Sequence, residues 1–175
     1  MEVKKFNPEV LYTNEPITKV NRDDIEYLKE KSQENLRKRI RLCAHQGVDD
    51  TLHEMLIIHT NETYVRPHKH FNKSESFHII EGACDVVIFD EEGTVSEVIP
   101  MGTFDSGKRF YYRLPEPYYH TLLIHSEFLV FHETTNGPFN RSETEFASWS
   151  PTEEDTAGVQ KFFEDLHSQL NSTKV

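Results

Sequence analysis

The chain of 175 residues has little cysteine, no long apolar run and no excess of basic charge. Its two cysteines, Cys43 and Cys84, form no CxxC pair and are too few for a disulfide framework. No segment approaches the roughly 18 apolar residues that a membrane span requires. The first residues also lack the apolar core of a signal peptide. We therefore expect a reduced, cytoplasmic protein without a membrane partner.

Acidic residues outnumber basic ones by 30 to 19, which gives a net charge of −11. Proteins that bind nucleic acid carry basic surfaces that displace counterions from phosphates, so we expect no nucleic-acid partner. The acidity favours solubility. It does not exclude a small anionic substrate, because a buried site can be locally positive inside an acidic protein.

Histidine, in contrast, is abundant, with ten in the chain. His68 and His70 are two residues apart, Glu75 follows five residues later, and His120 lies on a separate apolar segment. In a strand, side chains at i and i+2 share a face, so the first two histidines can hold one ion together. Three imidazoles and one carboxylate suit a divalent transition metal and leave coordination positions open. We predict one such ion, Zn, Fe, Mn or Ni, held by His68, His70, Glu75 and His120.

These residues resemble the first motif of the cupin superfamily. That motif reads HxH, three or four residues, Glu, six residues and Gly, and His68, His70, Glu75 and Gly82 match it in full. The resemblance implies a small β-barrel with a metal inside it.

The second cupin motif, Pro-x-Gly-x-x-His followed by Asn, is matched less completely. Pro115 and His120 fit it, whereas Pro117 replaces the glycine and Ile124 stands where Asn is common. These departures leave the expected metal ligand of the motif in place.

A wider likeness, from about residue 20 to residue 165, is to the WbuC family of cupin-fold metalloproteins. It is carried by residues 41–45, 52–56, 63–70, 136–139 and 145–151. Members often accompany surface-polysaccharide gene clusters, so the resemblance implies sugar chemistry, polysaccharide biosynthesis and a homodimer.

The pattern of apolar runs and turn residues, together with the resemblance above, predicts a single all-β cupin barrel of jelly-roll type. This is a double-stranded β-barrel, here with helical additions at both ends. Residues 1–50 are expected to form an N-terminal extension with a helix, 51–135 the barrel, and 136–175 a C-terminal extension whose helix packs on it. Many short apolar runs separated by turn residues indicate a sandwich or barrel. The runs are 52–59, 76–81, 83–89, 95–99, 110–114, 121–125 and 128–133.

Two helices are expected outside the barrel. Asn21 is a plausible N-cap for a helix that extends to about residue 38, and the basic residues Arg37-Lys38-Arg39 and Arg41 fall near its end. Such a run is more often a solvated helix end than an anion site. Ser150 and Pro151 predict the start of a second helix. Its apolar stripe, expected to be core or dimer contact, is Val159, Phe162, Phe163, Leu166 and Leu170.

Strand parity suggests which other side chains reach a substrate. Tyr64 and Arg66 have the parity of the two histidines, provided that the extended conformation continues through the intervening proline. Arg66 suits phosphate or carboxylate recognition, although a structural salt bridge at the barrel rim is an equal alternative. Arg113 and Tyr111 are further substrate-binding candidates. Glu133 is a candidate general base if its strand faces inward, and Tyr64 is the other catalytic candidate.

Two classes of function follow. The first is a metal-dependent isomerase or epimerase acting on an anionic sugar that is phosphorylated or nucleotide-linked, in which the metal is a Lewis acid and a nearby base moves a proton. With iron, the same site suits an oxygen-dependent dioxygenase. The second is a non-catalytic module that binds an anionic carbohydrate through the metal. A dedicated base near the metal favours the enzyme, and a site lined only by apolar groups and arginine favours the binder.

Overall fold

The computed structural model describes residues 1–172, and their strands form two sheets. The larger sheet, A, has the spatial order β1 (Val3–Asn7), β2 (Val10–Thr13), β3 (Arg39–Cys43), β4 (Leu52–Thr60), β11 (Phe128–Asn136), β6 (Glu75–Glu81) and β9 (Tyr111–Leu114). Sheet B has the order β12 (Thr144–Phe146), β5 (His68–His70), β10 (Tyr119–Ile124), β7 (Ala83–Phe89) and β8 (Val95–Gly102). Two 3₁₀ turns cover Phe104–Ser106 and Arg141–Glu143.

The sheets enclose one apolar core because alternate side chains along their strands point between them. Phe77, Ile79, Val86, Leu122 and Phe131 belong to this inner cluster, and each is almost fully buried. All strand pairs are antiparallel except β2 with β3. The expected all-β class, two sheets around one core with helical additions, is confirmed.

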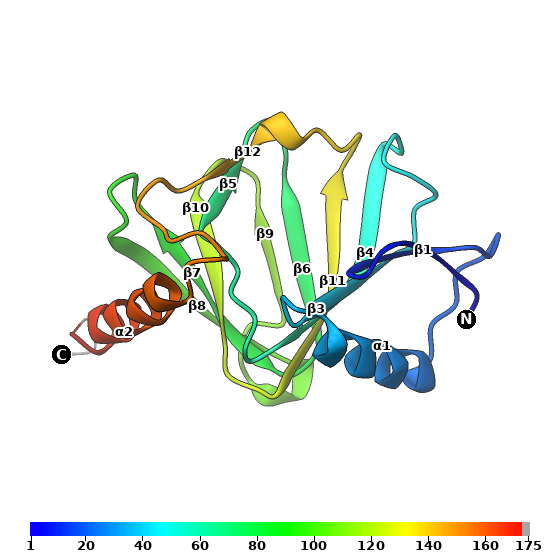
Figure 1. Ribbon diagram of the computed structural model, residues 1–175, viewed down its shortest axis with the longest axis horizontal. Coiled ribbons are helices and arrows are strands. Elements are labelled where there is room, and N and C mark those ends of the chain that lie inside the picture. The colour runs from blue at the N-terminus through cyan, green and yellow to red at the C-terminus, as the bar shows by residue number, and fades with distance from the viewer. Residues whose placement is uncertain (173–175) are drawn as a thin grey trace.

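Each sheet has one helix on its outer face (Figure 1). Helix α1 (Arg22–Glu34) packs Leu28 against Ile40, Ile58 and Val130 of sheet A. Helix α2 (Thr156–Ser172) packs against sheet B through Leu166 and its apolar neighbours, so the predicted stripe of this helix is core. In the described residues, no helix is long and apolar enough to cross a membrane.

The N-terminal region differs from its prediction in two respects. Asn21 does cap α1, and its side chain accepts from the Asp24 amide in a capping box. However, the helix ends at Glu34 rather than near residue 38, and the basic run that follows enters strand β3. Residues 1–20, expected to be part of an extension outside the barrel, supply β1 and β2, so sheet A begins well before residue 51.

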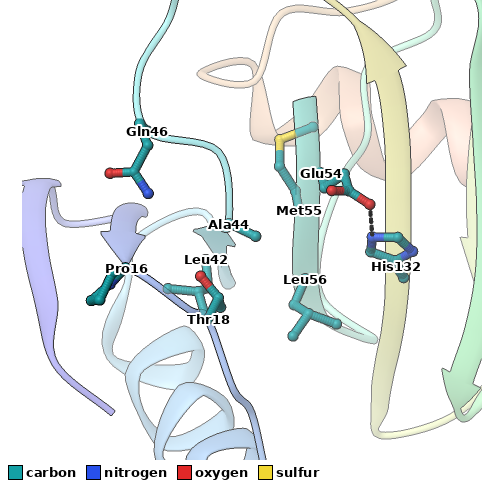
Figure 2. A pocket seen from close by; sticks show the side chains of 9 residues that line it. All are labelled: Pro16, Thr18, Leu42, Ala44, Gln46, Glu54, Met55, Leu56 and His132. Atoms are coloured by element: carbon teal, nitrogen blue, oxygen red, sulfur yellow. Dashed lines mark ion pairs between the residues drawn. The ribbon is translucent and has the colours of Figure 1, made fainter. Parts of the chain in front are cut away.

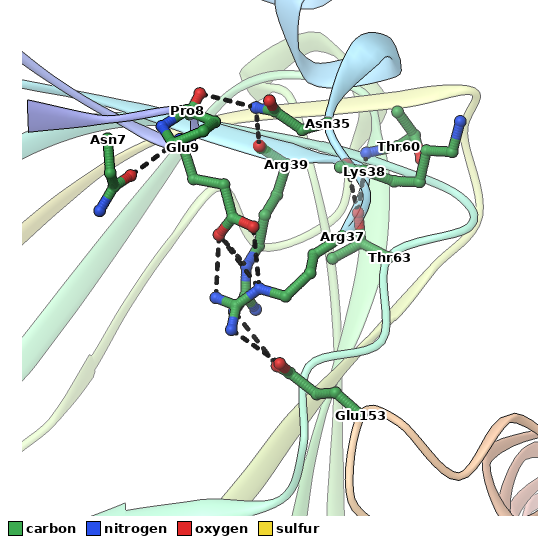
Figure 3. Close-up of polar contacts among 10 residues, drawn as sticks. All are labelled: Asn7, Pro8, Glu9, Asn35, Arg37, Lys38, Arg39, Thr60, Thr63 and Glu153. Carbon is green, nitrogen blue, oxygen red and sulfur yellow. Dashed lines mark hydrogen bonds and ion pairs between the residues drawn. The ribbon is translucent and has the colours of Figure 1, made fainter. Parts of the chain in front are cut away.

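The basic run is held in place by two carboxylates (Figure 3). The guanidinium groups of Arg37 and Arg39 pair with Glu9 at 2.9 and 3.4 Å and with Glu153 at 2.7 and 3.1 Å. Glu153 comes from the C-terminal segment, so this ion-pair cluster joins both ends of the chain to the start of β3.

The C-terminal helix begins at Thr156, five residues after Pro151, the predicted first residue. Ser150 caps nothing, because its hydroxyl accepts from Nε of Arg66 and donates to the Ala147 carbonyl. Residues 147–151 therefore form a strap across the outside of the barrel, and the helix starts only after this strap.

Gly82, the last residue of the first cupin motif, forms the tight turn between β6 and β7. Its φ is +87°, and a Cβ there would collide with the Phe128 carbonyl oxygen and the Ser126 hydroxyl. We expect Gly82→Ala to lose more than the roughly 1–2 kcal/mol of left-handed backbone strain. Gly107→Ala is the matched control, because Gly107 has φ +74° but nothing within 4 Å of the point where a Cβ would lie. Urea unfolding measures both, and equal losses would contradict the steric explanation.

Candidate metal centre

Three histidines converge at one end of the barrel. Strand β5 pairs with β10 so that His68 lies opposite His120, and His70 is two residues further along the same face. One ring nitrogen from each histidine lies within 4.8 Å of the other two. The structure thus brings together residues that lie far apart in the sequence.

Backbone and side-chain contacts orient these rings. His68 Nδ1 lies 2.8 Å from the Arg66 carbonyl oxygen, and His120 Nδ1 lies 2.9 Å from that of Tyr118. A carbonyl oxygen only accepts, so each Nδ1 carries the proton, and a neutral ring then has its lone pair on Nε2. His70 Nδ1 makes the equivalent contact, 2.9 Å from the Thr144 hydroxyl. Metal-binding histidines characteristically have their second nitrogen engaged in this way.

Glu75 closes the group from sheet A. Its carboxylate oxygens lie 2.9 Å from His120 Nε2 and 3.5 Å from His70 Nε2. Tyr112 donates its hydroxyl to Glu75 Oε1 at 3.3 Å. Burial raises the pKa of this carboxyl, but the adjacent His120 and His70 lower it overall, so Glu75 is ionised.

The donor set fits a divalent metal ion. Burial lowers the pKa of His68 to about 3 and that of His70 to about 4, so both rings are neutral near pH 7, as ligands must be. Burial also lowers the pKa of His120, but its contact with Glu75 raises that pKa overall, so His120 releases a proton when it binds a metal ion. Three imidazole nitrogens and one carboxylate oxygen are the donors that zinc, iron, manganese and nickel accept. The role of His68, His70, Glu75 and His120 as ligands is a prediction that this geometry supports.

Glu133 faces the same interior. On β11 it is two residues from Phe131, which is in the inner core, and two from Thr135, which is opposite Glu75 on β6. Burial and the negative charge of Glu75 raise the pKa of Glu133 to about 7. Within residues 1–172 its carboxyl has no hydrogen-bond or ion-pair partner. The condition that its strand faces inward is met, and the carboxyl can both accept and release a proton near neutral pH.

Tyr64 and Arg66 do not reach the cluster, so the parity argument for them is wrong. The Tyr64 hydroxyl donates to the Pro151 carbonyl, and its ring packs against Phe162 and Phe163 of α2. The Arg66 guanidinium donates to Ser150 and Ala147 of the strap. The reason is that β5 begins only at His68, so strand alternation does not extend back through Pro67.

Tyr111 and Arg113 do not face the cluster either, because the inward-facing residue of their strand lies between them. Strand β9 turns Tyr112 inward to Glu75, which leaves the two flanking side chains exposed on the outer face. Arg113 donates only to the Ser74 hydroxyl, at 3.3 Å. Sequence reasoning missed Tyr112 and also Thr144, which contacts His70. Tyr112 could have been found only if the phase of its strand were known, because no predicted ligand lies on β9.

A pocket lies elsewhere, on sheet A. It has a volume of about 410 Å³ and is bordered by Pro16 and Thr18 on one side and by Leu56 and His132 on the other (Figure 2). The odd-numbered side chains of β4 and β11 face the inner core. Leu56 and His132 are at even-numbered positions of these strands, so they point away from the barrel interior. This groove on the outer face of sheet A is therefore not connected with the histidine cluster.

Comparison with known families gives one match. A domain family of unknown function, DUF6016, matches residues 20–101. This range includes His68, His70 and Glu75 but not His120. A comparison with curated proteins finds no match.

Several solved structures resemble the chain at low identity. A protein from Shewanella oneidensis is 11% identical with a TM-score of 0.48, and the match covers 59% of this chain and 66% of that one. A proposed sugar phosphate isomerase from Acidithiobacillus ferrooxidans is 14% identical, with a TM-score of 0.40 and coverage of 50% and 51%. Oxalate decarboxylase from Bacillus subtilis is 18% identical, with a TM-score of 0.46 and coverage of 65% and 28%.

The matched region is less than two thirds of each of these three proteins. At such identities and TM-scores they carry no argument about activity.

Removal of a ligand tests the metal centre. We expect about one divalent metal ion per chain in protein purified without an affinity tag, and loss of most of it in His120→Ala, because three donors are left. His125→Ala is the control, since this exposed histidine pairs with Asp85 at 2.9 Å away from the cluster. Elemental analysis measures both. Equal metal content in the two variants, or no metal in the wild type after reconstitution, would contradict the prediction that these residues bind a metal ion.

The raised pKa of Glu133 has a consequence for stability. Between its ordinary value of 4.5 and about 7, the folded state retains a proton that the unfolded state has lost. Stability therefore falls as pH rises through this window, by at most about 1.4 kcal/mol per pH unit. Glu133→Gln lacks this loss, so its stability advantage should grow from pH 4.5 to pH 7. Urea unfolding of chelator-treated protein measures it, with the exposed Glu97→Gln as control. Parallel pH profiles for wild type and Glu133→Gln would show that the carboxyl titrates normally.

Proposed function

We propose that this protein is a metal-dependent isomerase or epimerase acting on an anionic sugar, either phosphorylated or nucleotide-linked. The likeness to the WbuC family supports a place in surface-polysaccharide metabolism. The observation that carries the enzymatic proposal is Glu133, an inward-facing carboxyl without a partner in the described residues, beside the three-histidine cluster.

The residues have separable roles in such a reaction. When bound by His68, His70, Glu75 and His120, a divalent metal ion supplies Lewis-acid polarisation of sugar oxygens. Tyr112 keeps Glu75 in place through its hydroxyl. In an aldose–ketose interconversion, Glu133 removes the proton from the carbon next to a carbonyl and returns it to the adjacent carbon, while the hydroxyl proton passes to the former carbonyl oxygen. In an epimerisation, the proton returns to the opposite face of the same carbon after the planar intermediate has turned over in the site. The proton is conserved in either case, so no co-reactant is needed.

A purely binding module is the weaker candidate. Such a module has no use for a free carboxyl at its centre, because a buried unpaired acid destabilises the fold and repels anionic ligands. Iron-dependent dioxygenation stays open as an alternative, since the donor set suits iron as well as zinc or manganese. The metal found in purified protein separates these reactions.

Proton transfer by Glu133 can be measured directly. With the metal-loaded protein in D₂O, we expect deuterium to enter C1 or C2 of at least one member of a panel of sugar phosphates and nucleotide-linked sugars. Glu133→Gln should exchange about 10²–10⁴-fold more slowly with its metal content unchanged, because it lacks the base. NMR of the sugar measures the exchange, and Glu97→Gln is the matched surface control.

Panel members that bind to the metal-loaded wild type without exchange or conversion would identify a binding module instead. Equal exchange rates in Glu133→Gln and wild type would remove Glu133 from the mechanism.

A further inference from the structure

Arg41 points into the barrel, although its sequence context suggested a solvated helix end. Side chains of β3 alternate, and Ile40 and Leu42 pack outward with Leu28 of α1. Cys43 belongs to the inner core. Arg41 is two residues before Cys43 and shares its face, so the guanidinium group is directed between the sheets.

The side chain of this arginine has no partner in the described part of the chain. Its Nε is buried without a hydrogen-bond acceptor, and the guanidinium group makes no ion pair. The contrast with Arg37 and Arg39 is clear, since both are neutralised by Glu9 and Glu153 (Figure 3). Burial of this nitrogen without a partner lowers stability, because the N–H loses hydration without gaining a hydrogen bond.

The charge of Arg41 acts on the interior that holds the candidate base. It lowers the pKa of Glu133, against the larger effect of burial. Lys73 acts on Glu133 in the same direction and lowers the pKa of His70. Lys73 also makes no ion pair in residues 1–172, and its Nζ lies 5.8 Å from the Phe139 ring centre. Two cations that make no ion pair in residues 1–172 thus act on Glu133, within a protein of net charge −11.

We propose that Arg41 binds an oxyanion, the distal phosphate or carboxylate of a substrate whose reacting end lies at Glu133 and the histidine cluster. The role of the anion in a substrate rests on the proposed function, whereas the anion site itself does not. A guanidinium group presents two parallel N–H donors that match phosphate and carboxylate oxygens. Arg66 and Arg113, the candidates suggested by the sequence, are engaged by the strap and exposed on the outer face, respectively.

Inorganic phosphate is the probe. Isothermal titration of the full-length chain, both metal-loaded and chelator-treated, separates a site at Arg41 from phosphate binding to the metal. We expect the chelator-treated wild type to bind phosphate and Arg41→Gln to bind it at least about tenfold more weakly, because a bidentate, charge-assisted contact is lost. Arg41→Lys should fall between them, because lysine keeps the charge but not the planar fork. Arg109→Gln is the control, as Arg109 is an exposed arginine in the loop before β9.

Thermal unfolding and circular dichroism show whether each variant is folded. If Arg41→Gln does not fold, the phosphate affinity of Arg41→Lys is compared with that of the wild type instead. Phosphate binding that is absent from the chelator-treated wild type, or unchanged in the folded Arg41 variants, overturns the anion site. Failure of the proposed isomerase is seen separately, as absence of deuterium exchange by the metal-loaded wild type. That result would leave the phosphate titration of chelator-treated protein unaffected.

Discussion

The candidate site depends on the pairing of β5 with β10, which sets His68 opposite His120. In each strand the ligand histidine donates its Nδ1 proton to the carbonyl two residues before it, at Arg66 and Tyr118. The backbone that positions each ring therefore also selects the tautomer of its neutral form, and Glu75 contacts the Nε2 atom of His120 from the other side. His70 and Glu75 then need only strand alternation and the adjacent sheet to complete the donor set.

Two carboxyl groups share this interior, and their environments push their pKa values apart. Glu75 lies against His120 and His70, which keep it ionised, whereas Glu133 is buried beside the negative charge of Glu75, which holds its pKa at about 7. Such separation is how one site obtains both a permanent anion and a proton carrier. Under the proposed function, Glu75 is the metal ligand because the imidazoles of His70 and His120 contact it, and Glu133 is left to act as the base.

Sequence reasoning performs well where a periodic rule has a fixed reference point. The HxH spacing, the apolar runs and the Asn21 cap each predict a local feature that the structure contains. It fails where the phase of a segment is set by distant contacts. Nothing near Tyr111 or Arg113 reveals that Tyr112 is the inward residue, and Arg41 reads as part of a helix end because pairing with β4 and β2, not local propensity, makes β3 a strand.

The interior groups that lack partners constrain the substrate. Arg41 and Glu133 have opposite charges when Glu133 is ionised and influence each other's surroundings, yet they form no ion pair within the described residues. Selection for stability alone would pair them or replace them with apolar side chains, because buried unpaired charges are costly. Groups kept apart in this way are complementary to a ligand that reaches both. The substrate class proposed above, an anionic hydroxycarbonyl compound such as an open-chain sugar phosphate, has an oxyanion for Arg41, an acidic C–H for Glu133 and neighbouring oxygens for the histidine cluster.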